Sequence, residues 1–345
     1  MSKPVHIQKL FLYSYEIPLK TSIFIRGVPF DVKKGLLIHF EDFETNRFWG
    51  ELSFLPPTEE KIKNAIEWLE KYHDYLLGEQ NVPLSGLPPE LKFAIESAVD
   101  CSGLRDDKIS ETTLKMNALL AGSFNEIIEG AKLKNKLGYS VFKIKLGEYS
   151  LTKAIDLVIR VREIIARDAG IVLDLNRQWE LNQTLNFVEH ILDKGILYIE
   201  DPVETLEELM TYLKVSPVKA GIDEFLERWN LQLESIYKEF SEKLVFVVKP
   251  SIVYGTDTWK NFLDSKSCGK VVTSAWETGV GLRGLLKIIL RNQMNIQFVG
   301  LDTYSYFKYD IVDPVFPITG PQISIKTVQE KFSVDIEKLS LIKSW

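Results

Sequence analysis

Two neighbouring stretches decide the fold of this chain: Val141-Phe-Lys-Ile-Lys-Leu146 and Ile171-Val-Leu-Asp-Leu175. Both are short, mostly apolar runs with charge near the C-terminal end, as expected of strands buried on both faces. Between them, residues 151–166 place apolar side chains at the spacing of one helix face. A strand, a helix and a second strand in this order predict two parallel strands joined by a crossover helix.

The same pattern repeats from about residue 114 to about residue 301. Strand-like runs alternate with helical stretches, and such alternation predicts a parallel sheet. Eight units of this kind can close into a barrel. The eight runs are Leu114–Leu120, Val141–Leu146, Ile171–Leu175, Leu197–Ile199, Lys219–Ile222, Leu244–Val248, Lys270–Thr273 and Ile296–Leu301.

The N-terminal part of the chain has a different pattern. Strand-like runs at 5–15, 35–43 and 46–51, the first ending near Pro18, precede two helical stretches that begin near residues 56 and 88. Strands followed by helices indicate a small α+β domain. The C-terminal tail is too short for another strand and helix, so we expect it to pack on this domain. The predicted boundaries are 1–112, 113–310 and 311–345.

Composition excludes several classes of protein. The chain has 345 residues, of which 45% are hydrophobic and 26% charged, an ordinary globular composition. A net charge of -6 without a basic stripe argues against nucleic acid as a partner. No signal peptide and no run of roughly 18 apolar residues is present, so no membrane partner is expected. Cys101 and Cys268 are too few for a disulfide framework or zinc ribbon. We expect a cytoplasmic protein that binds a small molecule; its oligomeric state is not predicted.

Charged residues mark the C-terminal ends of five consecutive predicted strands. Lys145, Asp174, Glu200, Asp223 and Lys249 follow one another at separations of 29, 26, 23 and 26 residues. In a barrel these strand ends meet at one mouth, where barrel enzymes place their chemistry. Each residue alone has a plainer explanation, such as an exposed strand face, a helix cap or a turn. The ordered set of five favours a shared active site instead.

The residue types in this set suggest metal-assisted proton abstraction. Three carboxylates in one cleft repel each other unless a cation neutralises them, and oxygen-only ligands favour Mg²⁺. Lys143 and Lys145 share one strand face. Two ammonium groups beside a divalent cation lower each other's pKa, and a lysine that is neutral near pH 7 can act as a general base. A metal-bound substrate carboxylate would stabilise the enediolate formed when the alpha proton leaves.

The glycine-rich stretch Gly279-Val-Gly281-Leu-Arg-Gly284 matches a dinucleotide-binding pattern. It lies in the seventh unit with only about 60 residues after it, too few for the remaining strands of a Rossmann fold. Two alternatives remain open. The helix start can bind a substrate carboxylate through its N–H groups, or the small residues can simply allow a helix and a strand to pack closely.

The full set of motifs resembles a known family. Lys143-Ile-Lys145, Asp174-Leu-Asn176, Glu200-Asp-Pro202, Asp223-Glu224 and Lys249-Pro-Ser251 together resemble the muconate lactonizing enzyme subgroup of the enolase superfamily. Within that subgroup the likeness is greatest to the o-succinylbenzoate synthases. Four stretches carry this finer likeness: Phe48-Trp-Gly-Glu-Leu-Ser53, Lys249-Pro-Ser251, Ser274-Ala-Trp-Glu-Thr-Gly279 and Gly300-Leu-Asp-Thr303. With Arg26-Gly27 in an N-terminal loop, the likeness covers nearly the full chain.

This resemblance implies a modified TIM barrel, (βα)₇β, with an N-terminal α+β capping domain. It implies a lyase of menaquinone biosynthesis that dehydrates 2-succinyl-6-hydroxy-2,4-cyclohexadiene-1-carboxylate to o-succinylbenzoate. Lys145 would be the base and Lys249 the cation on the opposite face of the substrate. Mg²⁺, which Mn²⁺ can replace, would be held by Asp174, Glu200 and Asp223.

The resemblance also implies supporting residues. Lys143, Asn176, Glu224 and Ser251 would contact the substrate or the metal ligands, Ser274 and Gly279 would surround the succinyl carboxylate, and Phe24–Phe30 would be a mobile loop over the substrate. One departure is Val172, where some family members carry a basic residue. Two alternatives remain. One is another enzyme on the same scaffold, either a racemase or epimerase of N-acylamino acids or dipeptides or a cycloisomerase, and the other is a degenerate barrel that only binds.

Overall fold

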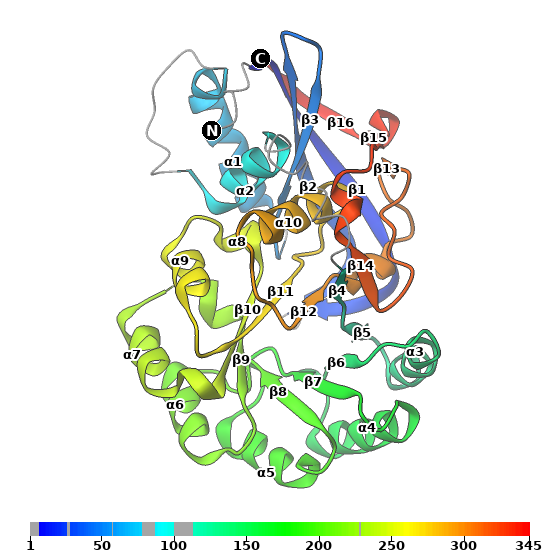
Figure 1. The fold of residues 1–345 in the computed structure, drawn as a ribbon, viewed down its shortest axis with the longest axis vertical. Helices are drawn as coiled ribbons and strands as arrows, with labels where there is room; N and C mark the ends of the chain where they lie inside the picture. The colour runs from blue at the N-terminus through cyan, green and yellow to red at the C-terminus, as the bar shows by residue number, and fades with distance from the viewer. Residues whose placement is uncertain (1–6, 26–27, 57, 78–86, 100–112, 228) are drawn as a thin grey trace.

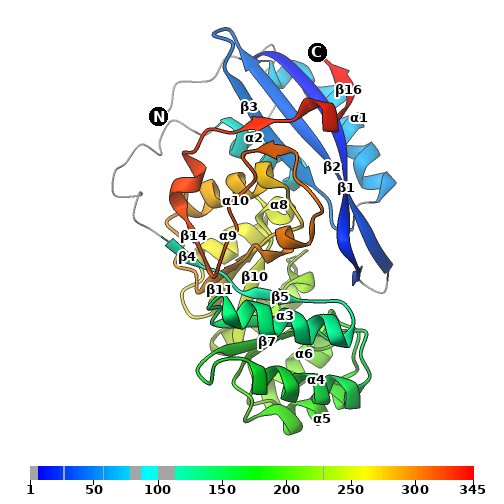
Figure 2. The ribbon, with the colours of Figure 1, turned by 90° about the vertical axis from the view of Figure 1, so that its right-hand side faces the viewer.

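The computed structural model describes residues 7–25, 28–56, 58–77, 87–99, 113–227 and 229–345. The chain forms a barrel and a separate antiparallel sheet that lies over one end of it (Figures 1 and 2). The predicted fold class, a modified TIM barrel with an N-terminal capping domain, is confirmed. Within the described ranges, none of the helices combines the length and apolar character that crossing a membrane requires.

Eight parallel strands form the barrel, in the order in which they occur along the chain. The sheet is nearly closed, since Met116 forms a parallel bridge with Val299 across its two edges. Helices between the strands cover the outside, which makes the arrangement (βα)₇β. The strands are β5 (Ala118–Leu120), β6 (Val141–Lys145), β7 (Gly170–Asp174), β8 (Ile196–Glu200), β9 (Ala220–Ile222), β10 (Leu244–Val248), β11 (Gly269–Thr273) and β12 (Phe298–Gly300).

The covering helices begin where the sequence offers capping residues. Ser123 with Glu126, and Thr205 with Glu208, form reciprocal capping boxes at the starts of two of them. Their apolar faces pack on the outer face of the sheet. The helices are α3 (Phe124–Lys136), α4 (Leu151–Ile164), α5 (Leu181–Ile191), α6 (Leu206–Val215), α7 (Leu231–Phe240), α9 (Asp257–Asp264) and α10 (Gly279–Arg291), with a short α8 (Pro250–Val253) after β10.

Alternation along the strands divides their side chains between two cores. Phe142 and Ile144 on β6 pack outward against the helices. The inner face holds a small apolar cluster that includes Val172, Tyr198 and Val247. Because side chains two residues apart share a face, the residues two positions further on point into the barrel mouth. These residues are Asp174, Glu200 and Lys249.

The predicted first run, Leu114–Leu120, is two separate strands. β4 (Thr113–Lys115) leaves the barrel and pairs antiparallel with β14 (Gln322–Ser324), whereas β5 pairs with β6. The prediction was wrong here because a continuous apolar run gives no sign that its partner changes in the middle.

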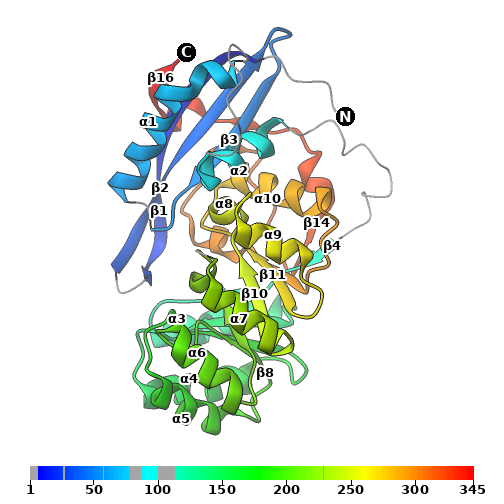
Figure 3. The same cartoon turned by 90° about the vertical axis from the view of Figure 1, so that its left-hand side faces the viewer.

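The capping sheet has the order β16-β1-β2-β3, and Figure 3 shows helices α1 and α2 packed on one face of it. The predicted end of the first strand near Pro18 was wrong: the strand continues to Ile25, with an irregular register between Pro18 and Ile23. The elements are β1 (Ile7–Ile25), β2 (Val28–Asp42), β3 (Arg47–Ser53), α1 (Glu59–Leu76) and α2 (Pro89–Val99).

The C-terminal segment returns to this sheet. Its last strand, β16 (Ser340–Ser344), pairs antiparallel with β1. Two further short strands, β13 (Val312–Asp313) and β15 (Ser333–Val334), pair with each other. The domain boundaries at 112/113 and 310/311 stay a prediction, since residues 100–112 lie outside the described ranges.

A buried histidine in the capping sheet predicts an acid-sensitive stability. The ring of His39 stacks on Trp49, with ring centres 4.1 Å apart, and on Phe11 at 5.3 Å. It is 2% exposed. Neither of its ring nitrogens has a hydrogen-bond partner among the described residues. Burial lowers the pKa of His39 to about 4, against the smaller, opposing effect of Glu41.

In the unfolded chain this imidazole takes up a proton near pH 6.5, whereas the folded chain resists it until about pH 4. The contribution of His39 to the free energy of unfolding is therefore greatest above pH 6.5. It falls by roughly 3 kcal/mol as the pH is lowered to about 4. We expect His39→Phe, which keeps an aromatic ring in the stack, to remove this loss. Urea unfolding at pH 7 and pH 4.5 measures it, with the exposed His190→Gln as control. An equal acid-induced loss in His39→Phe and wild type would contradict the assignment.

Candidate active site

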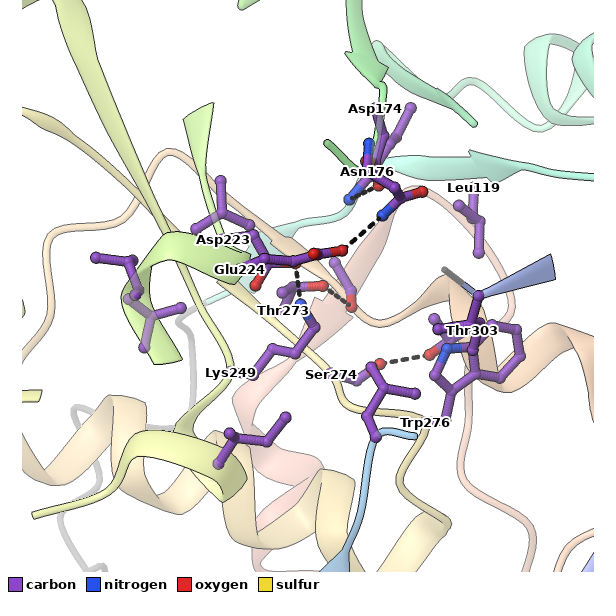
Figure 4. Close-up of a pocket in the computed structure, with 18 of the residues that line it drawn as sticks. Leu119, Asp174, Asn176, Asp223, Glu224, Lys249, Thr273, Ser274, Trp276 and Thr303 are labelled. Carbon is purple, nitrogen blue, oxygen red and sulfur yellow. Dashed lines mark hydrogen bonds and ion pairs between the residues drawn. The ribbon is translucent and has the colours of Figure 1, made fainter. Parts of the chain in front are cut away.

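A pocket opens at the C-terminal ends of the barrel strands, beneath the capping sheet (Figure 4). The barrel supplies most of its wall, and Ile25 and Leu55 reach it from the capping half. The structure brings eight predicted site residues together in this wall. They are Lys143, Lys145, Asp174, Asn176, Asp223, Glu224, Lys249 and Ser274.

The strand register places two of the acidic residues, Asp174 and Glu200, at one level of the barrel. Lys145 is paired with Asp174 across β6 and β7, Asp174 with Glu200 across β7 and β8, and Glu200 with Gly221 on β9. Asp223 follows two residues beyond Gly221, on the same side of the chain. Three adjacent strands thus direct these carboxylates into the mouth, with Asp174 and Glu200 at one level and Asp223 two residues further along its chain segment.

Amines and carboxylates alternate in this mouth. The Lys143 Nζ lies 2.9 Å from Asp174 Oδ2 and 2.5 Å from Glu200 Oε1, so it stands between the two carboxylates. The Lys145 Nζ donates to Asp174 Oδ2 at 3.0 Å and to Asn176 Oδ1 at 2.9 Å. Lys249 forms an ion pair with Asp223. Each lysine therefore neutralises at least one acidic side chain.

The two candidate catalytic amines come from opposite sides of the barrel. Lys145 ends β6, and Lys249 follows β10, four strands away in a barrel of eight. Figure 4 shows Lys249 across the pocket from Asp174 and Asn176, and also the contact of Asn176 Nδ2 with Glu224 Oε1 at 3.4 Å. A substrate in this pocket would have an amine on each face.

Three predicted residues lie outside the pocket wall. Glu200 is fully buried below the mouth. Ser251 is also buried and donates to the Glu277 carboxylate. The N–H of Gly279, expected to face a substrate carboxylate, instead donates to Asp310 Oδ2 at 3.1 Å. The predicted loop Phe24–Phe30 was wrong for most of its length: Phe24 and Ile25 end strand β1 and Val28–Phe30 begin strand β2, while residues 26 and 27 lie outside the described residues.

The comparisons with known proteins agree with this architecture. Residues 126–231 match the family model described as enolase C-terminal domain-like. Over these residues the barrel is similar to that of the enolase superfamily. The resemblance to the enolase superfamily predicted from the sequence is thereby confirmed, and the members of that superfamily are enzymes.

Curated relatives span nearly the whole chain. The o-succinylbenzoate synthase of Haemophilus influenzae is 26% identical over 312 residues, which cover 87% of this chain and 91% of that protein. The o-succinylbenzoate synthase of Pasteurella multocida is 24% identical over 331 residues, which cover 92% of this chain and 96% of that protein. Both alignments are longer than the barrel and therefore extend into the rest of the chain.

Solved structures of proteins named for other activities have the same fold. The dipeptide epimerase of Enterococcus faecalis, complexed with Mg and L-Leu-L-Tyr, has a TM-score of 0.75 at 20% identity and covers 92% of this chain and 97% of its own. The muconate lactonizing enzyme of Pseudomonas fluorescens, complexed with muconolactone, has a TM-score of 0.74 at 16% identity, covering 97% and 98%. At these identities the likeness establishes the fold alone.

The carboxylates crowded at the barrel mouth shift the pKa values of their neighbours. Burial raises the pKa of Glu200 to about 8; Lys143 opposes this, and Asp174 and Asp223 add to it. Burial would lower the pKa of Lys143, but the Asp174 and Glu200 carboxylates raise it well above its ordinary value. From the sequence, we expect a divalent cation to lower the pKa of Lys143. The protein groups by themselves raise it instead.

The acidic residues fit a divalent cation in the kind of ligand that they offer. They offer oxygen donors only, which suits a hard cation. One of these oxygens, Glu200 Oε2, is buried without a hydrogen-bond partner among the described residues. The side chains are not gathered around one point: in the described part of the chain no group of three or more acidic, histidine or cysteine residues forms a ready metal cage. The lysines hold the carboxylate oxygens that a metal would take, so the ligand role stays a prediction.

Sequence reasoning missed two residues that shape this mouth. Asp201, for which the sequence predicted no role of its own, is buried and accepts the backbone N–H groups of Asp223 and Glu224 at 3.1 and 3.0 Å. Trp276 lines the pocket with a backbone φ of 65°. The clue for Asp201 was its place directly after Glu200 in the conspicuous Glu-Asp-Pro motif; for Trp276 no local pattern predicted this conformation.

Proposed function

We propose that this chain is a Mg²⁺-dependent enzyme that removes a proton alpha to a carboxylate, with Lys145 as the base. The observation that carries the proposal is the arrangement of the mouth. Lys145 and Lys249 extend from opposite strands, and Asp174, Glu200 and Asp223 lie on the three strands between them. A planar or nearly planar substrate held there has an amine on each face.

Each polar side chain then has a role that its surroundings support. Asp174, Glu200 and Asp223 would hold Mg²⁺, which supplies positive charge to the substrate carboxylate as the alpha proton leaves. Lys145, oriented by its contacts with Asp174 and Asn176, would take the proton. Lys249 would face the opposite side of the substrate as a cation.

We further propose that the reaction is the o-succinylbenzoate synthase dehydration. The alpha proton of 2-succinyl-6-hydroxy-2,4-cyclohexadiene-1-carboxylate passes to Lys145 Nζ, and the bond between C6 and its hydroxyl then breaks. The same lysine can return the proton, so water and the aromatic o-succinylbenzoate leave. The curated relatives named for this activity support the choice. It would place the chain in menaquinone biosynthesis in the cytoplasm, and Mn²⁺ can replace Mg²⁺ in this proposal.

A second candidate is racemisation of N-acylamino acids or epimerisation of dipeptides. The amines on both faces suit it, because one lysine can take a proton and the other can return one from the opposite side. Solved structures of similar fold include such epimerases. A third candidate, a degenerate barrel that only binds, is disfavoured because the lysines Lys145 and Lys249 and the carboxylates Asp174 and Asp223 all line the pocket, with Glu200 buried beside them.

The test compares two substrates with one preparation of the enzyme. In deuterated water with Mg²⁺, we expect dehydration of the cyclohexadiene. The decrease of its diene absorbance measures this reaction. N-succinyl amino acids, added separately, report alpha-proton exchange by mass spectrometry. Exchange of the amino acids without dehydration of the cyclohexadiene would instead favour the racemase, and neither activity would favour the binding protein.

A further inference from the structure

The N-terminus of helix α10 is bound by a carboxylate from the capping sheet. Glu51, on β3, accepts the Thr278 N–H at 3.0 Å from Oε2, the Thr278 hydroxyl at 2.6 Å and the Gly281 N–H at 2.9 Å. The first N–H groups of a helix lack partners within the helix and attract anions. Here the anion is Glu51 of the same chain, which lies 227 positions before Thr278 and 230 positions before Gly281 in the sequence.

This contact explains one glycine of the Gly279–Gly284 stretch. A Cβ on Gly281 would lie 2.7 Å from Glu51 Oε2 and 2.6 Å from the Glu277 Cβ. Any larger residue would push the carboxylate away from the helix. The helix start is therefore an anion site, as one sequence interpretation held, but its occupant is an internal carboxylate rather than a substrate.

The segment before the helix, Ser274–Thr278, forms part of the pocket wall through Ser274 and Trp276 (Figure 4). Trp276 adopts the left-handed backbone region at a φ of 65°. This conformation costs a residue with a side chain about 1–2 kcal/mol and persists only where neighbouring contacts impose it.

Capping-sheet side chains hold the backbone on both sides of Trp276. On the preceding side, the carbonyl of Ala275 accepts from Ser53 Oγ at 2.7 Å and from Lys33 Nζ at 3.4 Å. On the following side, the Thr278 N–H is held by Glu51. The strained conformation of a pocket-lining residue is thus fixed from another sheet.

We propose that Glu51 is a positioning residue: by binding the start of helix α10 it holds the Ser274–Thr278 segment, and with it Trp276, in the pocket wall. The inference deepens the proposed function, and its kinetic part rests on that function. Glu51 does not contact the mouth where the proton transfer is proposed.

The chemistry of the Glu51 surroundings calls for a carboxylate rather than any polar group of this size. Four donors point at its two oxygens: the two N–H groups, the Thr278 hydroxyl and the Tyr15 hydroxyl at 2.5 Å. A glutamine would turn its NH₂ group toward some of these donors. Burial raises the pKa of Glu51 to about 7, with Lys33 opposing and Glu277 adding to the increase.

The test measures amide hydrogen exchange in the full chain at 25 °C, in wild type and Glu51→Gln. We expect the Thr278 and Gly281 amides to exchange at least tenfold faster in the variant. In the dehydration assay we expect the KM to rise about tenfold, with kcat within about threefold of wild type. Glu51→Asp, which keeps the charge but is one methylene shorter, should be intermediate. The exposed Glu16→Gln, on β1 of the same sheet, is the matched control.

A role in stability alone would lower the melting temperature of Glu51→Gln but leave KM and amide exchange at 25 °C unchanged, which would overturn the proposal. If Glu51→Gln does not fold, Glu51→Asp decides, and wild-type exchange and KM in it would also overturn the proposal. An inactive wild type would refute the proposed reaction, whereas amide exchange would still decide whether Glu51 holds the segment.

Discussion

Lys145→Ala is expected to lower the rate of the proposed dehydration by about three orders of magnitude or more. General base catalysis by a positioned side chain typically contributes about 10²- to 10⁴-fold, and here the base makes the committing proton transfer. Lys145 is held toward the pocket by Asp174 and Asn176, and the other lysine on the same face of β6 is Lys143. Lys143 is engaged between Asp174 and Glu200, which keeps it protonated.

Lys145→Arg separates the charge of this residue from its basicity. Arginine keeps a positive charge near Asp174 but cannot lose its proton in a protein. We therefore expect it to be as inactive as alanine in a turnover assay that follows o-succinylbenzoate. The exposed Lys153→Ala on α4 controls for nonspecific loss of a lysine. Lys145→Ala turning over like wild type, or Lys145→Arg retaining substantial activity, would show that Lys145 is not the base.

The sequence predicted the barrel well because its signal is local. Each strand is a short apolar run with a polar end, and the spacing of Asp174, Glu200 and Asp223 follows from one residue per strand and helix unit. Buried parallel strands require such runs, so the pattern and the fold have the same physical cause. The level of Asp174 and Glu200 in the barrel then follows from the register of neighbouring strands.

What the sequence could not predict depends on contacts between distant residues. The glycines at the start of α10 left two alternatives open, because nothing near them reveals that Glu51 lies against the helix. The same holds for Asp310, which takes the Gly279 N–H. The division of Leu114–Leu120 into β4 and β5 likewise depends on a partner about 200 residues later in the chain. Local pattern fixes the type of element more reliably than its partner.

The second large effect concerns the proposed metal. We expect Mg²⁺ to stabilise the EDTA-treated wild-type chain against thermal unfolding, by about 2.7 kcal/mol at a concentration 100 times its dissociation constant. In Glu200→Gln this stabilisation should be lost, together with at least a thousandfold of the dehydration rate. The reason is that the amide keeps the shape of the buried side chain but removes one of three negative charges.

Without Mg²⁺ the same substitution should change stability little. Ionising Glu200 is already unfavourable, since burial raises its pKa to about 8. Its one partner, Lys143, still has Asp174 at 2.9 Å after the change. We therefore expect wild type and Glu200→Gln to have unfolding free energies within about 1 kcal/mol in EDTA, and to diverge only when Mg²⁺ is added.

This dependence on Mg²⁺ distinguishes a metal ligand from a structural carboxylate. A purely structural Glu200 would make the variant unstable in EDTA as well, because breaking a required buried ion pair costs about 3–5 kcal/mol. The exposed Glu189→Gln on α5 is the control and should follow wild type in both conditions. Thermal scans of the three proteins, with and without Mg²⁺, decide the matter. A Mg²⁺-induced shift of equal size in Glu200→Gln and wild type would exclude Glu200 as a ligand.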